Sequence, residues 1–196
     1  MINFYYVHEK HKAQYPTYIL YLSCFLMVFI IKLFYRTADS SSLKFILTPV
    51  TKLVEVFTGT LYQFVPERGY LSSDLTVEIG PGCAGINFLV IMFCTLTFSF
   101  VKQFMSMASK IFAALSFLVF SYIITIIVNT FRIVTAINFS RYNDVYLGLD
   151  NEFFHKIVGA MVYFFFLVLC YIVVSKLITF LKPRLKAMEF IRGVQW

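Results

Sequence analysis

Residues 76–90 read TVEIGPGCAGINFLV, a Gly-Pro-Gly turn followed by a cysteine and then by the start of an apolar run. The run begins at Gly85 and continues to Val101, which is long enough for a helix to cross the ~30 Å hydrocarbon core of a membrane. The stretch therefore predicts that the chain enters a membrane directly after Cys83. A cysteine inside such a run is an ordinary packing residue, whereas a cysteine just before its start is a candidate catalytic residue.

The composition is that of an integral membrane protein. Hydrophobic residues make up 60% of the 196 residues and charged residues only 14%, well below the ~25% of soluble domains. Three further apolar segments, residues 18–35, 111–137 and 154–181, are long enough to span. We therefore expect residues 1–196 to form a single membrane-embedded all-α domain with about four transmembrane helices.

Residues 43–65 are also long enough to span, but they have the pattern of an amphipathic helix. Apolar residues recur at helical spacing on one face, and polar residues, including Thr51, Lys52 and Glu55, occupy the other. We expect an extracytoplasmic helix that lies in the interface or against the bundle. The alternative is a fifth span, which would place Lys52 and Glu55 in lipid at a high cost. Residues 66–82 mix polar residues and glycines with apolar alternation, which predicts a short turn or hairpin before the cysteine.

Basic residues are concentrated on one side of this four-span arrangement. The N-terminal tail, the connection between the second and third spans and the C-terminal tail contain Lys10, Lys12, Lys102, Lys110, Lys182, Arg184, Lys186 and Arg192. Acidic residues are enriched in the other two connections, residues 36–82 and 138–152. The positive-inside rule then places both termini in the cytoplasm and Cys83 at the outer face of the cytoplasmic membrane. The net charge of +7 also favours contact with anionic membrane lipid, and without a basic-aromatic motif we expect no nucleic-acid partner.

Cys83 differs from the other three cysteines of the chain. Gly82 and Gly85 flank it, and glycines allow close approach of the backbone, so we expect both to support the cysteine. Unpaired N–H groups and the dipole at a helix N-terminus favour a nucleophilic thiolate. The other cysteines lie well inside predicted spans and are expected to pack as small apolar residues: Cys24, Cys94 and Cys170.

Three further polar residues are predicted at the same membrane depth as Cys83. Asn129 and Arg132 are three residues apart, so they share a helix face near the outer end of the third span, and His155 lies in the first turn of the fourth. Each has an ordinary alternative: a snorkelling arginine, an interfacial histidine or an asparagine in an interhelical hydrogen bond. Their convergence beside the Gly-Pro-Gly turn favours a catalytic site. We expect no metal and no cofactor, because the sequence contains no cluster of metal ligands.

Three short motifs follow one another along the chain: CAG at residues 83–85, NTFR at 129–132 and HKIVG at 155–159. In this order and on a multispan frame, the set resembles the exosortase/archaeosortase superfamily of membrane transpeptidases. The stretch GPGCAGINF and the short chain look most like the exosortase K subgroup. The likeness covers about residues 43–181, and many members have Ser where Ala84 stands here.

The resemblance implies a membrane cysteine protease and transpeptidase. Cys83 would attack the scissile carbonyl and form a thioester, and His155 would exchange protons with the thiol and the leaving amine. Arg132 would stabilise the oxyanion or hold the substrate backbone, with Asn129 orienting it. The implied substrates are secreted proteins with a tripartite C-terminal sorting signal, made of a short motif, an apolar span and basic residues. The cleaved protein would be transferred to a cell-surface acceptor.

Two other classes of function stay open at this stage. The first is a non-enzymatic accessory subunit of an envelope polysaccharide or secretion system, in which Cys83 is incidental and Arg132 binds lipid. The second is a different thiol enzyme, such as a membrane acyltransferase or a protease that releases its product to water. Replacing Cys83 with Ala distinguishes the first class from an enzyme, because an accessory protein should keep its function. Trapping the product distinguishes a transpeptidase, which leaves the new C-terminus attached to an amine, from a protease, which leaves it free.

Overall fold

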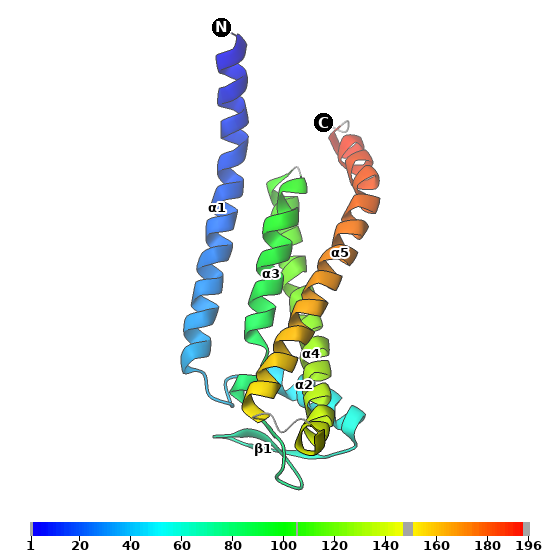
Figure 1. Cartoon of the computed structure of the whole chain (residues 1–196). Helices are drawn as coiled ribbons and strands as arrows, with labels where there is room; N and C mark the ends of the chain where they lie inside the picture. The colour runs from blue at the N-terminus through cyan, green and yellow to red at the C-terminus, as the bar shows by residue number, and fades with distance from the viewer. Residues whose placement is uncertain (1, 105, 147–150, 194–196) are drawn as a thin grey trace.

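Four long helices form the body of the protein in the computed structural model, which describes residues 2–104, 106–146 and 151–193, with side chains for 17–104, 106–139 and 156–181. They are α1 (Ile2–Thr37), α3 (Ile86–Phe100), α4 (Met107–Tyr146) and α5 (Asn151–Gly193). A short helix, α2 (Lys44–Thr58), and a small sheet lie together at one end of the bundle (Figure 1). At the opposite end α1 begins and α5 ends.

The four predicted spans are confirmed as helical segments long and apolar enough to cross a membrane. They comprise Thr17–Thr37, Pro81–Gln103, Met107–Phe139 and Lys156–Leu181, so the chain is a multi-pass membrane protein. The second is the most enclosed of the four, and α3 packs against both α4 and α5. The core between these three helices includes Phe88, Met92, Leu96 and Val128.

The helices α4 and α5 extend well beyond the predicted spans. The connection expected at residues 138–152 is mostly helical, because α4 continues to Tyr146 and α5 begins at Asn151. The sequence of this stretch is polar, with Arg141 and Asp144 among its residues. Helical hydrogen bonds join backbone groups, so a helix continues past the membrane without apolar side chains.

Helix α2 ends earlier than its sequence pattern predicts. Gly59 follows Thr58 in the left-handed conformation, with φ 69°, and its N–H binds the carbonyl of Glu55, which closes the helix. The residues that the pattern assigned to its last turns form a strand instead. Helix α2 has 15 residues and is not among the four helical segments long and apolar enough to cross a membrane, so the alternative of a fifth span is not borne out.

One face of α2 packs against the bundle. Its apolar residues are completely buried in a core shared with α3 and α4: Ile46, Leu47, Val50 and Val54. Tyr122 of α4 donates a hydrogen bond of 2.6 Å to the carbonyl of Phe45. Lys52 is exposed, as expected for the polar face, but Thr51 is buried at 1% exposure. The assignment of Thr51 to the polar face was wrong because its position borders the buried stripe.

The expected hairpin is a three-stranded antiparallel sheet, in the order β1 (Tyr62–Val65), β2 (Gly69–Ser72) and β3 (Glu78–Ile79). Arg68 and Glu78 form an ion pair of 2.7 Å beside it. In the turn after β2, hydrogen bonds from Ser72 and Thr76 hold the pKa of the Asp74 carboxyl below its ordinary value. The sheet ends at Ile79 and leads directly to the turn that contains Cys83.

The packing of α2 predicts opposite labelling of two adjacent residues. Lys52→Cys should react quickly with a membrane-impermeant thiol reagent added from one side of the membrane only, because this position is exposed. Thr51→Cys should react much more slowly from either side, because this position is buried. Gel-shift labelling measures both, with the unsubstituted chain as the reference for the native cysteines. Equal labelling at the two positions would contradict the packing of α2 on the bundle.

Candidate functional site

Cys83 lies in a tight turn between the sheet and α3. It is the last residue of a short 3-10 helix, η1 (Pro81–Cys83), and its N–H binds the carbonyl of Gly80 at 2.9 Å. The sequence placed Cys83 at the N-terminus of the membrane helix, but Ala84 and Gly85 separate it from the first residue of α3. The side chain of Cys83 is partly exposed, whereas Ala84 is completely buried. The turn thus fixes the backbone of Cys83 and leaves its thiol accessible.

The two glycines predicted to support Cys83 have different roles. Gly85 has a φ of 73°, and a Cβ atom on it would lie 3.1 Å from side-chain carbons of both Asn129 and Thr125. Only glycine meets both conditions without strain. Gly82 is exposed, and a Cβ atom on it would contact nothing within 4 Å. Gly85 therefore allows α4 to approach the turn, while a side chain at position 82 would meet open space.

Asn129 connects the turn to two helices. Its side chain is completely buried, and its amide nitrogen donates a hydrogen bond to the backbone carbonyl of Cys83. Its amide oxygen accepts a hydrogen bond of 2.7 Å from the hydroxyl of Tyr163 in α5. Both ends of the amide are satisfied, as a buried polar group requires. The turn, α4 and α5 are therefore fixed relative to one another at this point.

Arg132 contacts the cysteine directly. Its Nη2 lies 3.6 Å from Sγ of Cys83, within hydrogen-bonding distance for sulfur, and its Nη1 donates a 3.0 Å hydrogen bond to the hydroxyl of Tyr163. The Nε atom is buried and has no hydrogen-bond partner in the described part of the chain. Asn129 was expected to orient Arg132, and the contact between the two runs through Tyr163. The structure thus places a permanent positive charge against the thiol.

Tyr163 is a site residue that the sequence analysis missed. Its ring stacks on Phe88 of α3 at a centroid distance of 4.9 Å, and its hydroxyl bridges Asn129 and Arg132. In the sequence it is one tyrosine in an aromatic-rich apolar run. Helical spacing offered a signal, because His155, Gly159 and Tyr163 are four residues apart and share one face of a helix.

His155 belongs to α5, but its side chain lies outside the described residues. The helix begins at Asn151, so His155 is one turn into it and not in its first turn. Gly159, one turn further on the same face, packs against Arg132: a Cβ atom there would lie 3.3 Å from Cδ of the arginine. The backbone of α5 therefore carries position 155 on the face that adjoins Arg132.

Tyr35 is a second residue that the sequence analysis missed. It lies near the end of α1 and donates a 3.0 Å hydrogen bond to the carbonyl of Pro81. This bond holds α1 against the turn from the side opposite to α4. The backbone carbonyls of Pro81 and Cys83 are therefore each bound by a side chain from a different helix.

The described side chains include no group of three or more His, Cys, Asp or Glu residues placed to hold a metal ion. All four cysteines are free thiols; Cys24 and Cys170 are buried and Cys94 is half-buried. Comparison with protein-family models, with curated proteins and with solved structures finds no match to this chain.

The two glycines provide a matched test of how the turn is built. Gly85→Ala should destabilise the protein by about 1–3 kcal/mol, because it forces a positive φ on alanine and pushes against Asn129. Gly82→Ala should leave the stability unchanged, because the added methyl group meets open space. Thermal unfolding in detergent, followed by circular dichroism, measures both variants. Equal midpoints for the two variants would contradict the close approach of α4 to the turn.

Proposed function

We propose that this protein is a membrane cysteine transpeptidase of the exosortase type. The observation that carries the proposal is the 3.6 Å approach of Arg132 to the thiol of Cys83 at the mouth of a membrane span. An arginine beside a thiol is placed to donate hydrogen bonds to the carbonyl oxygen of a substrate that the sulfur attacks. Snorkelling alone explains a charge near the membrane surface, but it does not explain a guanidinium held against a cysteine by a half-buried tyrosine, which a buried asparagine positions in turn.

The reaction has two stages. The Sγ atom of Cys83 attacks the scissile carbonyl carbon, the C–N bond breaks, and the amine leaves with a proton, so that a thioester joins substrate and enzyme. An amine of the acceptor then attacks the thioester, forms a new amide and releases the thiol. The open space beside Gly82 is the side from which the substrate backbone approaches Cys83.

Arg132 has donors left for the transition state. A guanidinium carries five N–H groups, and in the resting site one is used by Tyr163 and one by the thiol. In the tetrahedral intermediate, Sγ of Cys83 and the carbonyl oxygen are bonded to the same carbon. The Nη2 atom that contacts Sγ is therefore placed to donate to the negatively charged oxygen. Such a donor typically contributes ~3 kcal/mol to an acyl-transfer transition state.

His155 is proposed as the group that moves protons. Its position on the face of α5 that adjoins Arg132 supports this role, and the near-neutral pKa of an ordinary imidazole suits exchange in both directions. The leaving amine takes a proton from it, and the incoming amine returns one.

The proposed substrates are secreted proteins with a tripartite C-terminal sorting signal. The apolar part of such a signal lies in the membrane, so its cleavage point comes to the membrane surface where Cys83 lies. The asymmetry of Lys and Arg along the sequence supports an outward-facing site in the cytoplasmic membrane and transfer to a cell-surface acceptor.

Cysteine replacement tests this function against an accessory role. Cells with Cys83→Ala should accumulate the uncleaved substrate at normal membrane levels of the variant, because the nucleophile is lost while Asn129 still binds the backbone carbonyl. Cys94→Ala is the control, since this residue lies on α3 away from Arg132 and should process normally. Mass spectrometry of the product should find its new C-terminus joined to an amine.

Three results would contradict the proposal. Normal processing by Cys83→Ala would leave an accessory subunit as the explanation. Equal loss in Cys94→Ala would show that the loss in Cys83→Ala comes from altered packing and not from a missing nucleophile. A free C-terminal carboxylate on every product molecule would indicate a protease that releases to water.

A further inference from the structure

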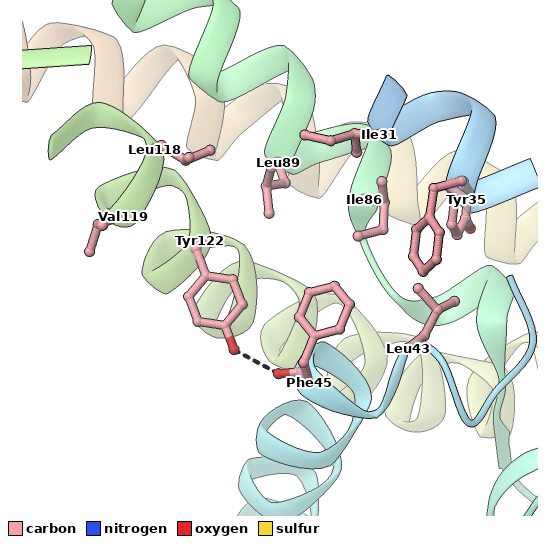
Figure 2. Close-up of a pocket in the computed structure, with 10 residues that line it drawn as sticks. Ile31, Tyr35, Leu43, Phe45, Ile86, Leu89, Leu118, Val119 and Tyr122 are labelled. Carbon is pink, nitrogen blue, oxygen red and sulfur yellow. Dashed lines mark hydrogen bonds between the residues drawn. The ribbon is translucent and has the colours of Figure 1, made fainter. Parts of the chain in front are cut away.

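Two cavities adjoin the turn on the side of α1, and neither takes part in the proposed chemistry. The first has a volume of about 380 Å³ and is lined only by apolar side chains and tyrosine rings from all of α1 to α4, including Ile31, Leu89 and Val119. Figure 2 shows these side chains around it. Its lining lies mostly in spans, so the cavity opens within the membrane.

The second cavity, of about 620 Å³, has a different character. Lys32 and Arg36 line it together with Pro81 of the cysteine turn. The two cations are four residues apart and therefore share one face at the outer end of α1. Lys32 is oriented by a 2.6 Å hydrogen bond from its Nζ to the side-chain oxygen of Asn87. Neither cation has an acidic partner among the described side chains, and the cavity is lined by no acid.

Tyr35 lines both cavities, so they meet at its side chain. An apolar cavity inside the membrane therefore adjoins a cationic cavity at the membrane surface. This order matches one molecule with an apolar chain and an anionic head. We propose that the two cavities form one phospholipid-binding site, with the lipid phosphate against Lys32 and Arg36 and an acyl chain in the apolar cavity.

The charge of the second cavity favours a lipid over an apolar peptide helix, because such a helix would leave Lys32 and Arg36 without a counter-charge. The phosphate supplies the counter-charge that Lys32 and Arg36 lack.

The site shares Pro81 with the cysteine turn, but neither Cys83 nor Arg132 lines it. The hydroxyl of Tyr35 binds the carbonyl of Pro81, two residues before Cys83. A lipid that packs against Tyr35 therefore contacts the side chain that holds the turn against α1. The lipid site follows from the cavities and charges alone, so a failure of the proposed function would leave it unaffected.

Native mass spectrometry of the full chain, delipidated and then titrated in detergent, tests the site. The probes are phosphatidylglycerol, a diacylglycerol with the same acyl chains and inorganic phosphate. The delipidated wild-type chain should bind one phosphatidylglycerol molecule and should bind diacylglycerol at least tenfold more weakly. The double variant Lys32→Gln with Arg36→Gln should bind phosphatidylglycerol roughly thirtyfold more weakly, since each cation near a lipid surface contributes about fivefold.

The apolar cavity is tested by filling it. Val119→Trp should also weaken binding at least tenfold, and it should not unfold the protein because Val119 is exposed at the edge of the bundle. The matched controls are Val168→Trp, at another exposed valine, and Lys102→Gln, near the other end of α3; both should bind like the wild type.

Four outcomes would overturn the inference. Equal binding of diacylglycerol would show that the phosphate is not recognised. Competition by inorganic phosphate at the same concentration as the lipid would reassign the site to a small anion. Displacement of the lipid by an equimolar apolar transmembrane peptide would assign the cavity to a helix. Unchanged lipid binding by both the double variant and Val119→Trp would show that the two cavities do not bind the lipid.

Discussion

The amide of Asn129 is the contact on which the site depends. It is completely buried between the cysteine turn and α5, and each of its polar atoms has one partner there, the carbonyl of Cys83 and the hydroxyl of Tyr163. An unpaired buried amide would cost about 1–3 kcal/mol. The turn, α4 and α5 are therefore held in one arrangement, and Gly85 makes this possible because a larger residue would keep α4 away from the turn. Cys83 lies beside this contact and is partly exposed.

The charge of Arg132 completes the account. A cation within a membrane bundle is costly unless it has partners, and the described partners of Arg132 are a neutral hydroxyl and a thiol. No carboxylate pairs with it among the described side chains. The sulfur of Cys83 lies 3.6 Å from Nη2, so the guanidinium is held against the atom that carries the proposed chemistry. The contact between Arg132 and Cys83 thus gives the charge a partner in the bundle and also underlies the proposed chemistry.

Hydropathy predicts the spans because crossing a membrane is a local property of the sequence. The end of α2 was not predicted, because Gly59 acts through its left-handed backbone and the residues after it pair with the next strand in a hairpin. Asn129 and Arg132 were found because polar residues in an apolar run are conspicuous. Tyr163 was not, because among many aromatic residues nothing in the sequence distinguishes the one whose hydroxyl meets two polar partners.

The central claim is that Arg132 acts on Cys83 through their direct contact, and the rate of alkylation at Cys83 tests it most directly. Iodoacetamide at pH 7, with peptide mass spectrometry of each cysteine, should modify Cys83 about tenfold faster in the wild type than in Arg132→Gln, because the guanidinium attracts the negative charge that sulfur carries as it attacks. Arg68→Gln, which removes an exposed arginine of the sheet, should alkylate like the wild type. An equal or faster rate at Cys83 in Arg132→Gln would show that the guanidinium only shields the thiol and would contradict the account.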